Sequence, residues 1–159
     1  MKKSEKIISE FFKPYFEKYP QMDSIWFLIY LIYDLEDGIY LADEDCGINE
    51  LRWDELSDEK MYDSSYKIQD AIENLKESKC DVANVIEDLQ KLVLKLRKDA
   101  EDSNPLRKVL DDVWNDDIIE KLTKKVSKHL AKEIPWKYVK WCQCNVNRDG
   151  SVKIDEYQR

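Results

Sequence analysis

The chain has 159 residues, and its 34 acidic and 26 basic residues give a formal net charge of −8 at pH 7. This length predicts a single domain over 1–159 that can bury a proper hydrophobic core. The negative charge argues against direct binding to nucleic acid or to membrane phosphates. The longest apolar run, 25–33, is far shorter than a membrane span, and the first residues are too polar for a secretory signal. We therefore expect a cytoplasmic protein that contacts no membrane.

The N-terminal third of the chain is predicted to form a helix followed by strands. Apolar residues at helical spacing over 7–16 predict a helix, which Pro14 should kink or divide. The run 25–33 suits either a buried helix or a buried strand. Seven of its nine residues are β-branched or aromatic, which favours a strand. An Asp-Gly turn and a second apolar run follow, so we predict a hairpin over about 25–43, with a further short strand possible within 48–53.

The middle of the chain is predicted to be helical. Apolar residues recur at helical spacing in four stretches, 68–75, 82–96, 106–114 and 118–134. The second stretch has the clearest amphipathic pattern, and Pro135 ends the last one.

The last fifteen residues fit two incompatible patterns. A helix-loop-helix calcium site needs oxygen ligands at loop positions 1, 3 and 5, Gly at 6, an apolar residue at 8 and Glu at 12. The chain fills these positions in order with Asn145, Asn147, Asp149, Gly150, Val152 and Glu156. However, position 1 carries no charge and no helical pattern flanks the loop. Calcium binding is therefore the weaker interpretation.

A β-hairpin explains the same segment better. Residues 147–150 suit a type I turn with Gly in the left-handed position, which gives a three-residue loop closed by a bulge. If Asn147 lies opposite Ser151, the register follows by counting outward. One face of the hairpin then carries the apolar pairs Val146–Val152 and Cys144–Ile154. The other face carries the polar pairs Asn145–Lys153 and Gln143–Asp155, followed by the aromatic pair Trp141–Tyr157.

Together these elements predict an α+β fold. We expect an antiparallel sheet of four to five strands, from two hairpins at about 25–43 and 136–157, packed with four to five helices. The two hairpins also suggest an internal repeat, here called the internal echo, because each follows a helix and a proline and contains an Asp-Gly turn. An old duplication and two copies of a common local solution both fit this pattern.

No arrangement of reactive residues predicts catalysis. The chain has three glycines and one histidine, His129, so it offers neither a phosphate-binding glycine loop nor a Cys/His nucleophile arrangement. The cysteines Cys46, Cys80, Cys142 and Cys144 lack Cys-x-x-Cys spacing. We expect them to be small buried residues in a reducing compartment, not zinc ligands. We expect no enzyme activity, no cofactor and no metal.

Two stretches, 34–63 and 99–120, are rich in acidic residues, and the first is the more acidic. Between residues 34 and 63, twelve acidic residues stand against two basic ones, with aromatic residues among them. Such a stretch can simply solvate an exposed face, but aromatic anchors inside a charged rim are typical of a protein-binding hot spot. We therefore predict a partner-binding surface formed by Asp34, Glu36, Asp37, Tyr40, Asp43, Glu44, Asp45, Glu50, Trp53, Asp54 and Glu55.

These features predict a small acidic binding protein that neutralises a basic protein partner. A nuclease or nucleic-acid-binding effector fits, because its own basic site must otherwise meet phosphate. Bacterial immunity proteins and phage-encoded inhibitors share this profile of small size, acidity and lack of catalytic residues. The run 133–136, which leads from a helix into the Asp-Gly hairpin, resembles the helix-to-hairpin entry of some immunity proteins that restrain nuclease toxins; the likeness covers about a quarter of the chain and includes no diagnostic motif.

Two alternatives belong to other functional classes. In the first, the chain is a helical scaffold subunit, and the stripe 82–96 meets a helix of a partner. In the second, the chain is a calcium-responsive module that uses the C-terminal loop.

Overall fold

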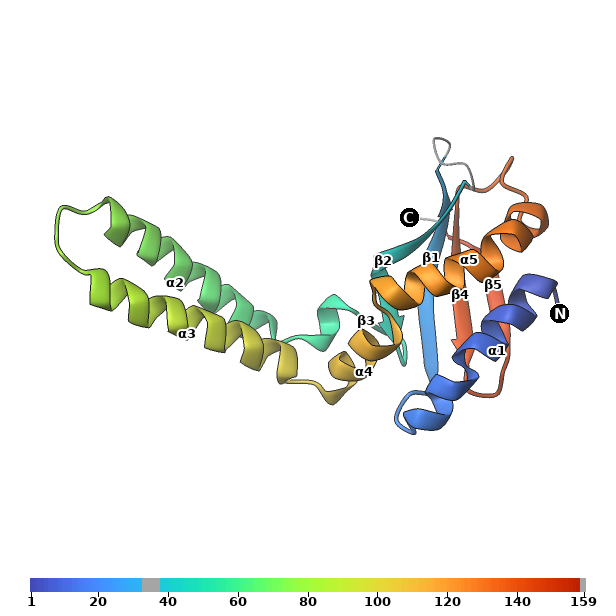
Figure 1. The fold of residues 1–159 in the computed structure, drawn as a ribbon, viewed down its shortest axis with the longest axis horizontal. Coiled ribbons are helices and arrows are strands. Elements are labelled where there is room, and N and C mark those ends of the chain that lie inside the picture. Colours follow the sequence, from blue (N-terminus) through green and yellow to red (C-terminus); the bar gives the residue numbers. More distant parts are fainter. Residues whose placement is uncertain (33–37, 158–159) are drawn as a thin grey trace. The chain divides into compact units, whose positions relative to one another are not determined.

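The computed structural model describes residues 1–32 and 38–157 (Figure 1). They fall into two compact units, Met1–Trp53 with Val109–Arg159 as the first and Asp54–Lys108 as the second. The first unit contains a five-stranded sheet, and the second contains a helical hairpin. The expectation of a single domain over 1–159 stays a prediction.

The strands of the first unit form one antiparallel sheet in the order β3-β2-β1-β4-β5. They are β1 (Ser24–Leu31), β2 (Ile39–Ile48), β3 (Leu51–Arg52), β4 (Trp141–Asn147) and β5 (Val152–Glu156). Both predicted hairpins are present, and β3 is the further short strand. The α+β fold is therefore confirmed, and the ambiguous apolar run forms a strand through Leu31.

The described residues contain five α-helices and one 3-10 helix. They are α1 (Lys3–Lys18), η1 (Asp54–Leu56), α2 (Glu59–Glu77), α3 (Ala83–Asp102), α4 (Pro105–Val113) and α5 (Asp116–Glu133). Helix α1 runs without interruption through Pro14, so the proline does not divide it. Each of α1 and α5 precedes a pair of strands, so the internal echo corresponds to a structural repeat of helix, strand and strand.

The two repeats interlock in the first unit. Strands β1 and β4 pair at the centre of the sheet, one from each repeat. Helix α1 packs on β4 and β5, helix α5 packs on β2, and the two helices contact each other. Figure 1 shows both helices on the same face of the sheet. Each helix therefore covers strands of the other repeat, and neither repeat can bury its sheet face alone.

An aromatic cluster forms the centre of this helix-covered face. Phe27 of β1 stacks on Trp114 with a centroid distance of 4.3 Å, and Phe12 of α1 lies 6.2 Å from both rings. The Trp114 indole N–H donates to the backbone oxygen of Ala42 at 2.8 Å, so its polar atom is satisfied inside the core. The four residues are at most 5% exposed.

The C-terminal hairpin has the register predicted from the sequence. Val146 pairs with Val152, and the pairing continues outward through Cys144–Ile154 and Gln143–Asp155. At the turn, the amide of Asn147 donates to the oxygen of Ser151, and Gly150 has a φ of 86°. Such a positive φ favours glycine, which explains the Asp-Gly sequence.

The second unit is a helical hairpin with a thin core. Its buried residues include Leu56, Ile72, Val93 and Ala100, each at most 2% exposed. Other apolar residues of the predicted stripe 82–96 remain exposed, for example Leu92 at 42%. The stripe therefore packs partly against α2 of the same chain.

Candidate functional site

Six of the predicted partner-binding residues lie on or beside β2 in the first unit. Tyr40, Asp43, Glu44 and Asp45 belong to β2, Glu50 lies in the turn to β3, and Trp53 follows β3. Asp54 and Glu55 belong to the 3-10 helix of the second unit, where both are exposed. Asp34, Glu36 and Asp37 lie outside the described residues. The candidate site is therefore built from the residues of the first unit.

The three acidic residues of β2 lie in a bulge. The register between β1 and β2 shifts after the pair Phe27–Cys46, and it resumes at Ile29–Leu41. Four residues of β2, 42–45, thus lie opposite the single residue Leu28. Bulges commonly redirect side chains at a sheet edge, and here Asp43 and Glu44 are exposed within a strand whose neighbours are buried. We call residues 42–45 the acidic bulge.

An aromatic row lies across the three strands next to this bulge. Tyr30 of β1 pairs directly with Tyr40 of β2 and with Trp141 of β4. Its ring centroid lies 4.6 Å from each of the two neighbouring rings, with tilts of 41° and 43°. Side chains alternate between the faces of a strand, so Tyr30 lies on the face opposite Phe27 and away from α1 and α5. We call Tyr40, Tyr30 and Trp141 the aromatic row, and this side of the sheet the helix-free face.

The aromatic row and the acidic bulge belong to one electrostatic environment. The pKa of Tyr30 is raised to about 12, first by burial, then by the neighbouring Tyr40, and further by the negative charges of Asp43 and Asp45. Those carboxylates are therefore close enough to disfavour a phenolate at Tyr30. Asp45 also forms a long ion pair with Arg52 of β3, at 3.9 Å.

A further aromatic residue, Trp26, lies at the other end of the helix-free face. Trp26 of β1 lies over Gly47 of β2, and a Cβ atom at Gly47 would lie 2.3 Å from the indole nitrogen. On β4, the amides of Gln143 and Asn145 bond to each other at 3.0 Å. The helix-free face thus carries aromatic and polar side chains around Leu28, which is 1% exposed, whereas the helix-covered face is apolar.

Sequence reasoning placed Tyr40 in the site but missed Tyr30, Trp26 and the role of Trp141. The missing step was the pairing of β1 with β4, which unites residues more than a hundred positions apart. A signal existed in the alternation of β1, where Trp26 and Tyr30 occupy the face opposite Ile25, Phe27 and Ile29. When one face of a strand carries aromatic rings with polar atoms and the other carries only apolar residues, the first face is the accessible one.

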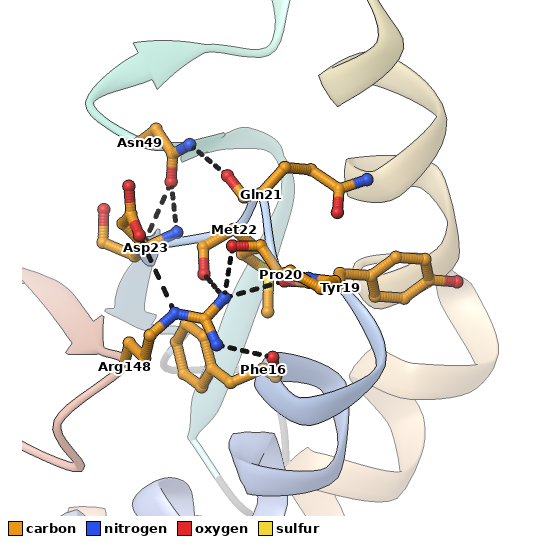
Figure 2. Close-up of polar contacts among 9 residues, drawn as sticks. Phe16, Tyr19, Pro20, Gln21, Met22, Asp23, Asn49 and Arg148 are labelled. Carbon is orange, nitrogen blue, oxygen red and sulfur yellow. Dashed lines mark hydrogen bonds and ion pairs between the residues drawn. The ribbon is translucent and has the colours of Figure 1, made fainter.

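The C-terminal loop, which also fits a calcium pattern, is used to hold the fold together (Figure 2). Arg148 points from the turn towards the end of α1, where its guanidinium donates to backbone oxygens of Phe16, Tyr19, Pro20 and Met22. The last carbonyl groups of a helix lack partners and carry partial negative charge, so an arginine there is stabilising.

Asn49 holds the same region from the opposite side, as Figure 2 shows. Its side-chain oxygen accepts from the amides of Asp23 and Ser24, and its side-chain nitrogen donates to the oxygen of Gln21 at 2.7 Å. Asn49 and Glu50 both have positive φ, at 50° and 67°, as a two-residue type I′ turn between β2 and β3 requires.

Asp149, which the calcium interpretation would use as a ligand, has another role in the hairpin. The carboxylate of Asp149 accepts from the amide and the hydroxyl of Ser151, at 2.8 and 2.6 Å, and these bonds lower its pKa. Strands β4 and β5, not helices, flank the turn. The helix-loop-helix geometry of the calcium interpretation is therefore not formed. Over 1–32 and 38–157, no three His, Cys, Asp or Glu residues are grouped to hold a metal ion.

The cysteines follow the sequence prediction in part. Cys46, Cys142 and Cys144 are buried, and burial raises the pKa of the Cys144 thiol far above its usual value. Cys80 is exposed, so the expectation of burial is wrong for this residue. It lies in the connection between α2 and α3, where the neighbouring residues 76–81 are also exposed.

Neither a protein-family model, nor a curated protein, nor a solved structure matches the chain. Among the described residues, no helix combines the length and the apolar character needed to cross a bilayer. The compartment stays a prediction.

Proposed function

We propose that the chain is a binding protein that neutralises a basic protein partner, in the manner of an immunity or antitoxin-type inhibitor of a nuclease or nucleic-acid-binding effector. The observation that carries this proposal is the position of the acidic bulge beside the aromatic row on the helix-free face. The proposed role is recognition alone, without a catalytic step, cofactor or metal.

Aromatic rings and carboxylates supply different parts of such recognition. Tyr and Trp offer large, rigid contact areas and dominate many interface hot spots. Carboxylates at the rim attract a basic partner and speed the encounter, with little contribution from each exposed charge to the final affinity. The row and the bulge place both kinds of group on one face of a rigid sheet.

The class of partner follows from charge. The net charge of −8 repels phosphate, so a nucleic acid is a poor direct ligand. A nuclease or other nucleic-acid-binding protein carries the complementary positive site, and carboxylates that cover it would exclude the phosphate backbone.

Capture followed by an activity assay tests this proposal. The full chain is immobilised and exposed to extract of its source cells, and a retained protein is purified and assayed for nucleic-acid cleavage or binding. We expect a basic protein whose activity falls as the chain is added. Binding should weaken steeply with salt, because screening acts on the charges at the rim.

A charge-matched pair of variants locates the surface. Asp43→Asn with Glu44→Gln should slow association by about tenfold at low salt and weaken the final affinity by a smaller factor. The control, Asp70→Asn with Glu77→Gln, changes the net charge equally at exposed positions of α2 and should leave binding nearly unchanged. Equal effects of the two pairs, or a partner whose activity is unaffected, would contradict the proposal.

The scaffold alternative has one observation in its favour. Val85 and Leu92 are 51% and 42% exposed and lie two helical turns apart on α3, so they share one side of the helix. A partner helix could cover them. In that case Leu92→Gln would abolish a self-association that is visible in sedimentation equilibrium, whereas a chain that stays monomeric at high concentration would exclude self-assembly through this helix.

A further inference from the structure

We propose that the aromatic row binds a guanidinium group, so that an arginine side chain of the basic partner is the anchor of the interface. This inference rests on the proposed function and makes it specific: the row discriminates arginine from lysine, whereas the acidic bulge only attracts positive charge. The ligand would be an exposed arginine in a basic segment, lying against the aromatic row with its charge towards the acidic bulge.

The shape of the row suits a flat, extended cation. Tyr30 contacts both neighbours at 4.6 Å, so the three rings form one continuous row across β2, β1 and β4. A guanidinium is planar and weakly hydrated, and it can stack on an aromatic ring while its N–H groups bond to carboxylates at the side. An ammonium is compact and strongly hydrated, and it gains less from the same surface.

The sheet holds the row in place before any ligand arrives. Tyr30 lies at the centre of the sheet and pairs with strands on both sides, so the backbone beneath the rings is fixed. Rings that are already positioned lose little conformational entropy when a ligand binds.

The chain already uses arginine in this way elsewhere. The guanidinium carbon of Arg97 lies 5.2 Å from the ring centroid of Tyr66, and that of Arg148 lies 5.6 Å from the ring centroid of Phe16. In both places the N–H groups also bond to oxygen at the side, on Ser65 and on backbone carbonyls. The row and the bulge offer the same two elements to a side chain of another molecule.

Titration of the full chain with hexa-arginine and with hexalysine tests the inference. The two peptides carry the same number of charged side chains, so a difference in affinity reports the side-chain chemistry. We expect hexa-arginine to bind at least about threefold more tightly. Tryptophan emission should change with hexa-arginine, because Trp141 is part of the row. Equal affinities for the two peptides would overturn the inference.

Ring variants separate the row from the bulge. Tyr30→Leu should remove the preference for arginine, Tyr30→Phe should keep it, and Tyr138→Leu, at an exposed tyrosine outside the row, should leave it unchanged. Asp43→Asn with Glu44→Gln should weaken both peptides alike. If Tyr30→Leu does not fold, Tyr40→Leu at the end of the row gives the same test. A preference that survives loss of the rings would overturn the inference.

The two proposals fail in different ways. If a basic partner is captured and inhibited but the arginine preference is absent, the inference falls and the proposed function stands. If the preference depends on Tyr30 but the captured partner is not inhibited, the row is a guanidinium site and the neutralising function falls.

Discussion

The two faces of the sheet in the first unit use aromatic residues differently. On the helix-covered face, Phe27 and Trp114 stack 4.3 Å apart and are at most 5% exposed. On the helix-free face, Tyr30 contacts Tyr40 and Trp141 at 4.6 Å, and all three are only partly buried. Ring contacts of nearly equal length thus build a core on one side and leave an accessible surface on the other.

The difference lies in what surrounds the rings. The core cluster satisfies its single polar atom internally, through the bond from Trp114 to Ala42. The row instead has phenol groups and nearby carboxylates, which are compatible with water and with a charged ligand. A packed aromatic cluster is therefore not in itself evidence of a core, and its neighbours decide whether it stabilises or recognises.

The largest expected effect comes from the helix-covered face. Phe27→Ala should lower the free energy of unfolding by about 3–5 kcal/mol, because it leaves a cavity between Phe12 and Trp114. Tyr30→Ala should cost clearly less, since its ring is partly exposed. Urea unfolding of both variants measures the difference, and equal losses would contradict the distinction between the two faces.

A smaller loss is expected where backbone and ring approach closely on the helix-free face. A Cβ at Gly47 would lie 2.1 Å from the backbone oxygen of Leu51 and 2.3 Å from the Trp26 indole nitrogen. Gly47→Ala should therefore cost about 2–3 kcal/mol through displacement of β3 and the ring. Thermal unfolding and the tryptophan emission of the variant compared with that of the wild-type chain report the two displacements. An unchanged midpoint would show that the strand accommodates a methyl group.

Arg148 should contribute about 2 kcal/mol without belonging to either face. Arg148→Ala removes its bonds to carbonyls at the end of α1 and in the following loop. Arg148→Lys should recover less than half of the loss, because one ammonium cannot reach acceptors arranged around a planar fork. Complete recovery by lysine would mean that charge alone stabilises the helix end.

The smallest effect is expected in the alkaline range. The pKa of Tyr30 is raised to about 12 in the folded chain, against about 10 in an unfolded one. The folded state therefore holds the proton more tightly, so this contribution is complete below pH 10 and is lost as pH rises towards 12. The phenolate absorbance of the native chain minus that of Tyr30→Phe should show the late titration. Tyr62, also raised to about 12, remains in both and cancels. Ionisation near pH 10 would contradict the burial of the Tyr30 ring and the proximity of the bulge.

Local patterns were sufficient to predict much of the fold. The register of the C-terminal hairpin followed from one turn, because Asn147 and Gly150 fix the loop and the alternation of the strands fixes the faces. The strand nature of 25–31 followed from its β-branched and aromatic residues. Propensity and turn chemistry act over a few residues, so they are visible in the sequence.

The candidate site depends on longer-range features that no local pattern contains. The row exists because β1 pairs with β4, and the bulge exists because the register of β2 shifts between Leu41 and Cys46. The sequence shows twelve acidic residues between 34 and 63 but not which strand, turn or unit each of them occupies. The extent of the predicted surface therefore exceeds the part that lies beside the row.

The central claim is that the helix-free face, and not the exposed acidic residues elsewhere in the chain, receives a basic partner. Chemical-shift mapping of the isotope-labelled full chain with hexa-arginine tests it most directly. The account predicts shifts concentrated at Tyr30, Tyr40, the acidic bulge and the indole N–H of Trp141. Shifts confined to α2 and α3, or spread evenly over all exposed carboxylates, would contradict it.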